Sequence, residues 1–291
     1  MMGRLLSQGI CSGAVFAALA SVWASEADEI QFEPLAGSVY ISRTDGHEPP
    51  NIIASVGDDG VVMVDAPGAV ASDPILAALE RISNTPLRFV INTHVHGDHT
   101  GGNLAFRTLA PIIAHRNVRT RMMSGGEEMP AEARPNVTFE SEMHLHFNGE
   151  DIRLLKLPAG HTDGDVVVFF TKANIVHMGD VFIAPAASFG DRSSGGSFLA
   201  LIAALEYVLP QIPIDAKIVP SHGPISSRAD VARGLEILKE MKAIVEAGIA
   251  AGKTREQLIA EKPFDQWKGS IAWFIPPDGY VSSFYKELAV R

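Results

Sequence analysis

Short apolar runs separated by Gly, Pro, Asn and Asp recur along the middle of the chain, and they predict buried β-strands. The predicted strands cover residues 39–41, 51–56, 61–64, 89–92, 111–114, 143–147, 152–157, 166–171, 175–178 and 217–219. Residues 57–60, Gly-Asp-Asp-Gly, mark a turn between the second and third runs. Apolar runs of this length suit buried strands.

Helical spacing of apolar residues predicts two longer helices. Asp73 is expected to cap the first helix, with Pro74 at its first position. The second helix follows Ser227 and ends by Gly252. Its apolar stripe consists of Val231, Leu235, Leu238, Met241, Val245 and Ile249. Because strands and helices interleave along the chain, the fold class is α/β.

The segment 94–99, His-Val-His-Gly-Asp-His, holds the highest density of chemically active side chains. It follows the apolar run 89–92, so we expect it on a loop that leaves a strand end. In extended backbone His94 and His96 share a face and can bind one ion, whereas on a helix they would point apart. Asp98 and His99 fall beyond Gly97, where they can reach a second ion.

Three further candidate ligands occur in the same setting. His161 follows the run 154–157, Asp180 follows 175–178, and His222 follows 218–219. Side chains that several strands deliver to one rim of a fold are typical of metal centres in sheet-based enzymes. The sequence therefore predicts a metal site at one end of the sheets.

With these four segments in this order, residues 33–225 resemble the metallo-β-lactamase superfamily. The resemblance implies a four-layer αβ/βα sandwich of two mixed β-sheets with helices on the outer faces. It also implies two metal ions, with His94, His96 and His161 on the first, Asp98, His99 and His222 on the second, and Asp180 bridging both. Nitrogen and oxygen ligands without a thiolate suit zinc, two ions per chain, although iron or manganese would also be accepted.

Asp180 is where the chain departs from the best-known lactamases with a three-histidine first site. Those enzymes have a cysteine near this position and, three residues later, a lysine that holds the substrate carboxylate. This chain has Asp180 and Ile183. A bridging aspartate is typical of the wider family, including glyoxalase II-type thioesterases, lactonases and phosphodiesterases. The departure weighs against efficient β-lactam hydrolysis without excluding it.

The expected function is therefore that of an exported dinuclear-zinc hydrolase. A water shared by two zinc ions loses its proton near pH 7 instead of ~15.7, and the hydroxide would attack a small amide, ester, lactone or thioester, β-lactams included. Asp98 and Asp180 are the expected catalytic carboxylates, since the free oxygen of Asp98 can orient the hydroxide. Two alternatives remain, an iron-dependent oxidoreductase resembling persulfide dioxygenases and a periplasmic accessory protein for quinoprotein maturation.

Two loops offer candidate substrate contacts. His47 lies in a loop between strands that overhangs the metals in the family. Arg192, in the loop 186–197, is the best cation for a substrate carboxylate, and a solvated loop charge is the alternative. The remaining histidines outside the motifs are expected to be structural or to face solvent on a polar strand face, and not to bind metal. They are His115, His144, His146 and His177.

The first residues predict export. Arg4 precedes the apolar stretch 13–20, and cleavage after Ala20 or Ala24 would remove residues 1–24 as a signal peptide. A membrane anchor is the alternative, but the stretch is shorter than the ~20 residues that span a bilayer. Cys11 is the only cysteine, so the mature chain would form no disulfide and use no thiolate. These features favour a periplasmic or secreted location without a stable membrane anchor.

Residues 25–291 are expected to form one hydrolase domain. The formal charge is −10 and becomes −11 without Arg4, which disfavours nucleic-acid phosphates as a substrate and leaves a small molecule. The sequence does not indicate an oligomeric state. In the aromatic-rich segment 253–291, Thr254 and Gln257 form a capping-box pair that opens a short helix. The aromatic residues after it are expected to pack on their own domain, with a dimer contact or a wall of the substrate groove as alternatives.

Overall fold

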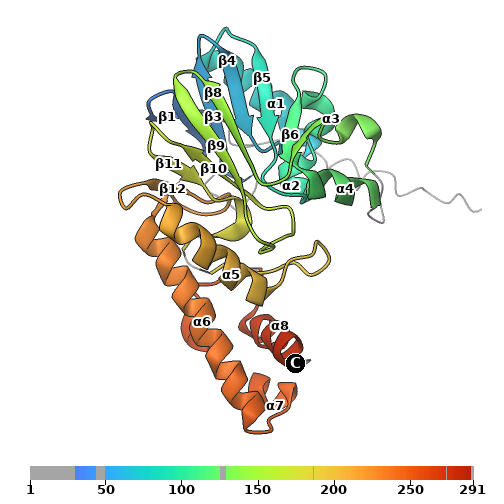
Figure 1. Ribbon diagram of the computed structural model, residues 1–291, viewed down its shortest axis with the longest axis vertical. Coiled ribbons are helices and arrows are strands. Elements are labelled where there is room, and N and C mark those ends of the chain that lie inside the picture. The colour runs from blue at the N-terminus through green and yellow to red at the C-terminus, as the bar shows by residue number, and fades with distance from the viewer. Residues whose placement is uncertain (1–29, 44–49, 125–128, 186, 273, 290–291) are drawn as a thin grey trace, which may run out of the picture.

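Two mixed β-sheets face each other, and helices lie outside them (Figure 1). The computed structural model describes residues 30–43, 50–124, 129–185, 187–272 and 274–289. The expected α/β sandwich of two mixed sheets is confirmed. The predicted signal peptide and His47 lie outside the described residues.

The first sheet has the strand order β1-β2-β3-β4-β5-β6-β7. Its strands are β1 Glu33–Ala36, β2 Val39–Ser42, β3 Ile52–Gly57, β4 Gly60–Val64, β5 Leu87–Ile91, β6 Ile112–His115 and β7 Val137–Phe139. Strands β1 to β4 are antiparallel neighbours, and β4 to β7 are parallel. The parallel pairs need crossovers. They contain α1 (Ala69–Ile82), α2 (Gly97–Thr100), α3 (Asn103–Phe106), α4 (Arg116–Ser124) and the 3₁₀ helix η1 (Ala131–Ala133).

The second sheet has the order β13-β12-β11-β10-β9-β8. Its strands are β8 Glu142–Phe147, β9 Glu150–Lys156, β10 Val166–Phe170, β11 Ile175–His177, β12 Lys217–Val219 and β13 Ser226–Ser227. Only β11 and β12 are parallel, and the connection between them contains η2 (Gly179–Val181), α5 (Phe198–Val208) and η3 (Leu209–Gln211). This connection returns the chain to the same end of the sheet, so the segments after β11 and after β12 meet there.

Alternation within the strands produces three apolar layers. In β10, Val166, Val168 and Phe170 face the first sheet, whereas Val167 and Phe169 pack with the outer helices α5 and α6. In β3, Ile53 joins the layer between the sheets and Ile52 packs on the α1 side. Both faces of these strands are buried, which explains why their sequences read as continuous apolar runs.

The C-terminal part is helical. It consists of α6 (Arg228–Ala250), α7 (Arg255–Ala260), η4 (Asp265–Trp267) and α8 (Pro277–Leu288), and α7 and α8 lie near the far end of α6 (Figure 1). The predicted capping box of Thr254 and Gln257 is present at the start of α7. Tyr280 and Phe284 are buried against Phe198 of α5, so these aromatic residues pack on their own domain. No helix among the described residues is long and apolar enough to cross a membrane.

The predicted start of the first helix is wrong. Helix α1 begins at Ala69, four residues before Asp73, and Pro74 lies inside it. The turn before Pro74 is helical because it packs, with Ser72 buried and Ala71 in the apolar layer under the first sheet. Pro74 leaves the carbonyl of Val70 without its helical N–H, but Val70 is exposed and water can replace that donor.

Candidate metal centre

Loops at one end of the two sheets bring together all seven predicted ligand side chains. His94 and His96 follow β5, Asp98 and His99 lie in α2, His161 follows β9, Asp180 lies in η2 after β11, and His222 follows β12. The Gly97 turn proposed from the sequence begins α2, and this short helix directs Asp98 and His99 away from His96. The sheet edge thus collects residues that are up to 128 positions apart in the chain.

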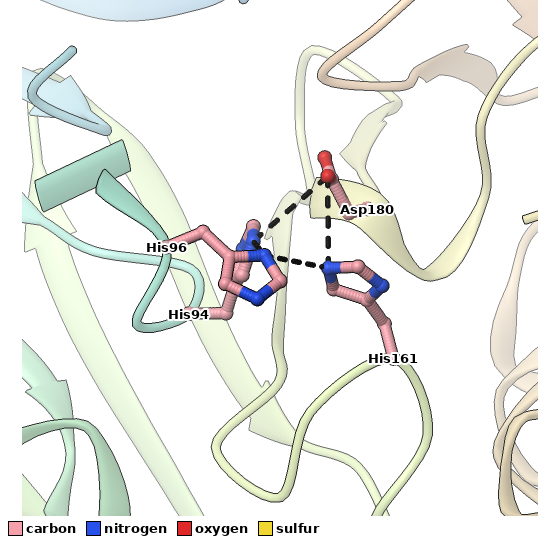
Figure 2. Close-up of side chains that lie close together, drawn as sticks. All are labelled: His94, His96, His161 and Asp180. Carbon is pink, nitrogen blue, oxygen red and sulfur yellow. Dashed lines mark hydrogen bonds and ion pairs between the residues drawn. The ribbon is translucent and has the colours of Figure 1, made fainter. Parts of the chain in front are cut away.

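The first group consists of His94, His96, His161 and Asp180, whose side chains point toward one another (Figure 2). The Nδ1 atom of His96 lies 3.1 Å from Nε2 of His94 and 3.0 Å from Nε2 of His161. Oδ2 of Asp180 lies 3.9 Å from Nε2 of His94 and 3.7 Å from Nε2 of His161. Three imidazole nitrogens and one carboxylate oxygen therefore surround one point.

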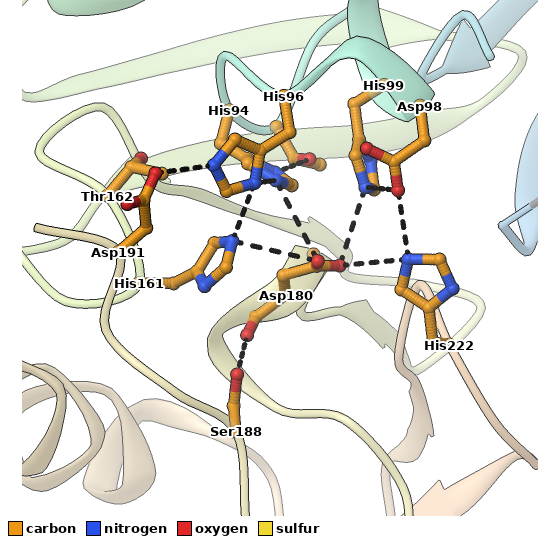
Figure 3. Close-up of polar contacts among 12 residues, drawn as sticks. His94, His96, Asp98, His99, His161, Thr162, Asp180, Ser188, Asp191 and His222 are labelled. Carbon is orange, nitrogen blue, oxygen red and sulfur yellow. Dashed lines mark hydrogen bonds and ion pairs between the residues drawn. The ribbon is translucent and has the colours of Figure 1, made fainter. Parts of the chain in front are cut away.

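The second group consists of Asp98, His99, His222 and the same Asp180. Oδ2 of Asp98 lies 3.1 Å from Nε2 of His99 and 3.1 Å from Nε2 of His222. Oδ1 of Asp180 lies 3.5 Å and 3.7 Å from the same two nitrogens. Asp180 therefore stands between the groups and offers a different oxygen to each (Figure 3).

The outward-facing ring nitrogens of His161 and His99 donate hydrogen bonds. Nδ1 of His161 lies 2.9 Å from the carbonyl oxygen of Phe189, and Nδ1 of His99 lies 2.8 Å from Oδ2 of Asp65. Carbonyl and carboxylate oxygens accept and do not donate, so both protons belong to Nδ1. In the neutral rings Nε2 then carries a lone pair, and it points into the site.

His96 and His94 are fixed in the same way. Nε2 of His96 donates to Oδ2 of Asp191 at 2.9 Å, which leaves the lone pair on Nδ1. The Thr93 hydroxyl lies 2.9 Å from Oδ2 of Asp65 and 3.0 Å from Nδ1 of His94. Because its one proton goes to the carboxylate, Thr93 accepts from Nδ1 of His94. The outer partners of all four rings thus direct lone pairs inward, as partners of metal-binding histidines do.

These observations test whether the residues fit a metal. In the first group, Nδ1 of His96 lies 3.1 Å from Nε2 of His94 and 3.0 Å from Nε2 of His161, with no proton between these atoms, an arrangement that a cation stabilises. Nε2 of His99 and Oδ1 of Asp180 are buried without a hydrogen-bond partner. Unsatisfied buried polar atoms are costly, and both of these belong to the second group. The donor set and its geometry therefore fit two metal ions.

Burial and the neighbouring charges shift the pKa values of the histidines in opposite directions in the two groups. Burial, together with the neighbouring histidines, holds the pKa of His94 well below its usual value and lowers that of His161 to about 4. Burial also opposes protonation of His99, but the charges of Asp65 and Asp180 outweigh it and raise the pKa of His99 well above its usual value. Positive charge is thus stabilised between the carboxylates, where a metal ion would supply it.

The other predicted residues lie outside both groups. Arg192 is half-exposed and its Nη1 lies 3.9 Å from Oε1 of Glu287 in α8, so its role in substrate binding stays a prediction. His144 and His146 are on the exposed face of β8, as predicted. His115 and His177 are buried and contact backbone atoms.

Two residues that matter to this geometry were not predicted. Asp65 is fully buried directly after β4, has a left-handed backbone with φ of 69°, and bonds both Thr93 and His99. Asp191 precedes Arg192 in the loop for which only a substrate contact was predicted, and it bonds His96. An acid directly after a buried strand was the signal for Asp65, whereas the sequence contains no such signal for Asp191.

A family model described as the metallo-beta-lactamase superfamily matches residues 45–238. The chain belongs to this superfamily. The match includes both groups of the metal centre and ends inside α6, so α7 and α8 lie beyond it. The resemblance seen in the sequence is confirmed.

Curated relatives of the chain include two kinds of enzyme. The chain is 30% identical over 162 residues to a hydroxyacylglutathione hydrolase of Nitrosococcus oceani, a match that covers 53% of the chain and 57% of the relative. It is 31% identical over 162 residues to the 2,4-dinitroanisole O-demethylase subunit alpha of a Nocardioides species, covering 53% of the chain and 47% of that protein. The matches thus span about half the length of these relatives.

Solved structures of superfamily members share the fold. The metallo-beta-lactamase from Pontibacter korlensis aligns with a TM-score of 0.63 at 20% identity, over 72% of this chain and 99% of that chain. The metallo-beta-lactamase from Hirschia baltica aligns with a TM-score of 0.61 at 21% identity, over 72% of this chain and 97% of that chain. At this identity the likeness describes the fold alone.

Proposed function

We propose that this protein is a dinuclear-zinc hydrolase that cleaves a small carbonyl substrate. His94, His96 and His161 would bind the first ion, Asp98, His99 and His222 the second, and Asp180 both. The position of Asp180 is the observation that carries the proposal, because its two oxygens face different groups and Oδ1 is buried without a hydrogen-bond partner.

Zinc is the metal that the donor set favours, since nitrogen and carboxylate ligands at such sites suit it. Two bound zinc ions would supply a water with a pKa near 7 and an electrophile for a carbonyl oxygen. No serine or cysteine nucleophile is then required. Among the described residues, none of the side chains in either group is a thiol or an alcohol.

Asp98 is the proposed proton acceptor. Its Oδ2 is held by the contacts to His99 and His222, while no described residue hydrogen-bonds to Oδ1. The side chain is 29% exposed, so water has access to it. Burial alone would raise the pKa of Asp98, but contact with His222 and His99 outweighs burial and holds the carboxyl ionised. An ionised Oδ1 can orient the attacking water and take its proton.

The proposed substrates are thioesters, esters, lactones and amides. The hydroxyacylglutathione hydrolases among the relatives support a thioester. Ile183 lies at the position where the family resemblance implies a lysine in cysteine-type lactamases. It is an apolar residue and 2% exposed, so this position offers no cation to a β-lactam carboxylate. We therefore place thioesters before β-lactams.

We also propose that residues 1–24 direct export and that residues 25–291 form the working enzyme in the periplasm or outside the cell. The proposal rests on Arg4, the apolar stretch 13–20 and the small residues at Ala20 and Ala24. Nothing in the metal centre depends on it.

A turnover assay on metal-analysed protein tests the proposed reaction. The substrates are a hydroxyacylglutathione, a lactone and the β-lactam nitrocefin. Each is assayed with zinc-loaded protein, with chelator-treated protein and with the Asp98→Asn variant. We expect zinc-dependent hydrolysis of at least the thioester, lost with the chelator and reduced by at least about 100-fold in Asp98→Asn. Protein that carries iron and consumes oxygen with a persulfide, but hydrolyses none of the three, would contradict the proposal in favour of an oxidoreductase.

A further inference from the structure

His96 is the least enclosed of the histidines in the first group. Its side chain is 27% exposed, compared with 1% for His94 and 0% for His161. Around the ring lie the other two imidazoles of the group, at centroid distances of 4.8 and 4.7 Å. Packing therefore restricts the orientation of this ring less than that of its neighbours, and its outer hydrogen bond to Asp191 gains importance.

Asp191 differs from the partners of the other two rings in carrying a charge. His94 bonds a hydroxyl and His161 a backbone carbonyl, both neutral. A carboxylate bonded to the outer nitrogen fixes the tautomer of a ligating imidazole and raises its basicity. Loss of Asp191 should therefore weaken the first group more than loss of a neutral partner would.

The carboxylate of Asp191 is itself held in place. Oδ1 accepts hydrogen bonds from the backbone N–H of Ser193 at 2.9 Å and from its hydroxyl at 2.6 Å, which leaves Oδ2 for His96. The backbone N–H of Asp191 donates to the carbonyl of His161 at 2.8 Å, and its carbonyl accepts from Gly196 at 2.7 Å. Asp191 thus links two histidines of the first group.

Arg121 of α4 contacts the loop that contains Asp191 and Ser193. It forms a two-pronged ion pair with Asp163, at 2.6 and 2.7 Å, and donates to the carbonyl of Ser193 at 2.9 Å. Gly195, with φ of 77°, lies against the guanidinium of Arg121, which leaves no room for a Cβ at this position. The loop is therefore built to hold one conformation, with Asp191 aimed at His96 (Figure 3).

We infer that Asp191 is a positioning residue that orients His96 and sets the affinity of the first group for its metal ion. This inference rests on the ligand assignment of the proposed function. Asp191 touches neither the second group nor Asp180 in the described contacts, so its effect should be confined to one of two ions.

The test is a zinc titration of the metal-free full chain against a chromophoric chelator, with Asp191→Ala, Asp191→Asn and the control Asp163→Asn. Asp163 is a matched carboxylate in the same network that contacts no histidine ring. We expect Asp191→Ala to weaken one of the two ions by about 10–100-fold and leave the other unchanged. Asp191→Asn, whose amide oxygen can still accept from His96, should lose less, and Asp163→Asn should bind both ions nearly as the wild type does.

Cobalt substitution distinguishes a local change at the first group from a general loss of stability. In Asp191→Ala the visible absorption of the Co²⁺ ion in the first group should shift, while the thermal unfolding of the metal-free protein stays close to that of the wild type. Wild-type affinity for both ions in Asp191→Ala, or an equal loss in Asp163→Asn, would overturn the inference. If Asp191→Ala fails to fold, the zinc affinities of Asp191→Asn are compared with those of Asp163→Asn, and a loss confined to one ion in Asp191→Asn supports the inference. A wild-type chain that binds no zinc would instead contradict the proposed function.

Discussion

At the residue scale, Asp180 has the most exacting position. Its side chain is 6% exposed, and its two carboxylate oxygens lie 3.5–3.9 Å from histidine nitrogens of the two groups. The hydroxyl of Ser188 donates to its backbone carbonyl, which fixes the turn that carries it. Since one side chain serves both groups, its removal would cost both ions a charged ligand.

We predict that Asp180→Ala lowers turnover by at least the ~10–100-fold expected even of lost outer partners, and weakens the binding of both ions. Zinc content after dialysis and the initial rate of hydrolysis measure the two effects. His144→Ala is the control, because His144 lies on the exposed face of β8 and should leave metal content unchanged. Normal rates with both zinc ions retained in Asp180→Ala would show that this carboxylate is not needed for metal binding or for turnover.

His115 provides a pH-dependent prediction outside the metal centre. Burial, aided by the positive charges of Lys156 and Arg116 and opposed by the Glu140 carbonyl and Asp163, lowers the pKa of His115 to about 4. The unfolded chain has a histidine pKa near 6.5, so His115 stabilises the fold above that pH and loses this contribution as the pH falls from about 6.5 to 4.

The slope for one such histidine is up to about 1.4 kcal/mol per pH unit. We expect His115→Gln to lose less free energy of unfolding than the wild type between pH 7 and pH 5. Urea denaturation of metal-free protein at both pH values measures the difference. Identical losses in the two proteins would mean that His115 titrates normally in the fold.

The sequence allowed the candidate ligands to be predicted because spacing and strand ends mark them. The outer partners could not be predicted in this way. Asp65 and His99 are 34 positions apart, and His96 and Asp191 are 95 apart, so no local pattern joins them. Only the folded sheets bring these carboxylates to the rings.

At the element scale, apolar runs predicted the central strands to within a few residues, because burial on both faces leaves an unbroken pattern. Strands β1, β7 and β13 were missed, since they are short and partly exposed. Helix α5 was missed because it is apolar nearly all round and shows no period. Helix α8 was not predicted because Pro276, Pro277 and Gly279 are typical of a turn. Pro277 nevertheless suits the first position of a helix.

The C-terminal helices hold the loop that follows Asp180. The hydroxyl of Tyr280 lies 3.2 Å from the carbonyls of both Ala187 and Ser188 and accepts from the backbone N–H of Ala272 at 3.1 Å. The ring of Phe189 in the same loop packs on His161 with centroids 4.6 Å apart. The segment beyond the family match thus supports the first group from outside.

We expect Tyr280→Phe to lower the free energy of unfolding by about 1–3 kcal/mol, because buried backbone groups lose their partner while the ring still packs. Tyr285→Phe is the matched control on the same helix, since its hydroxyl makes one partly buried bond to Lys253. Chemical denaturation of both variants measures the effect. Equal losses in the two would show that the Tyr280 hydroxyl has no special role.

At the scale of the whole molecule, the apolar pattern predicted an α/β class, but pairing the strands into two sheets required the family resemblance. Interleaved strands and helices are equally typical of one parallel sheet. What distinguishes the sandwich is that β1–β4 and β8–β10 are antiparallel neighbours, and strand pairing depends on contacts between segments that the linear pattern does not specify.

Export is a prediction about the whole chain, and it rests on residues outside the described structure. Intact mass of protein from the periplasm of an expressing bacterium should show a chain that begins at Ser21 or Ser25. A full-length chain found only in the cytosol would contradict the export proposal. The metal centre would be unaffected.

The central claim is that the two groups each bind an ion and share Asp180. Elemental analysis of protein purified without chelator tests this most directly. We predict close to two zinc ions per chain in the wild type and about one in His222→Ala, because His222 belongs to the second group and not to the first. Wild-type protein without any bound transition metal would contradict the account.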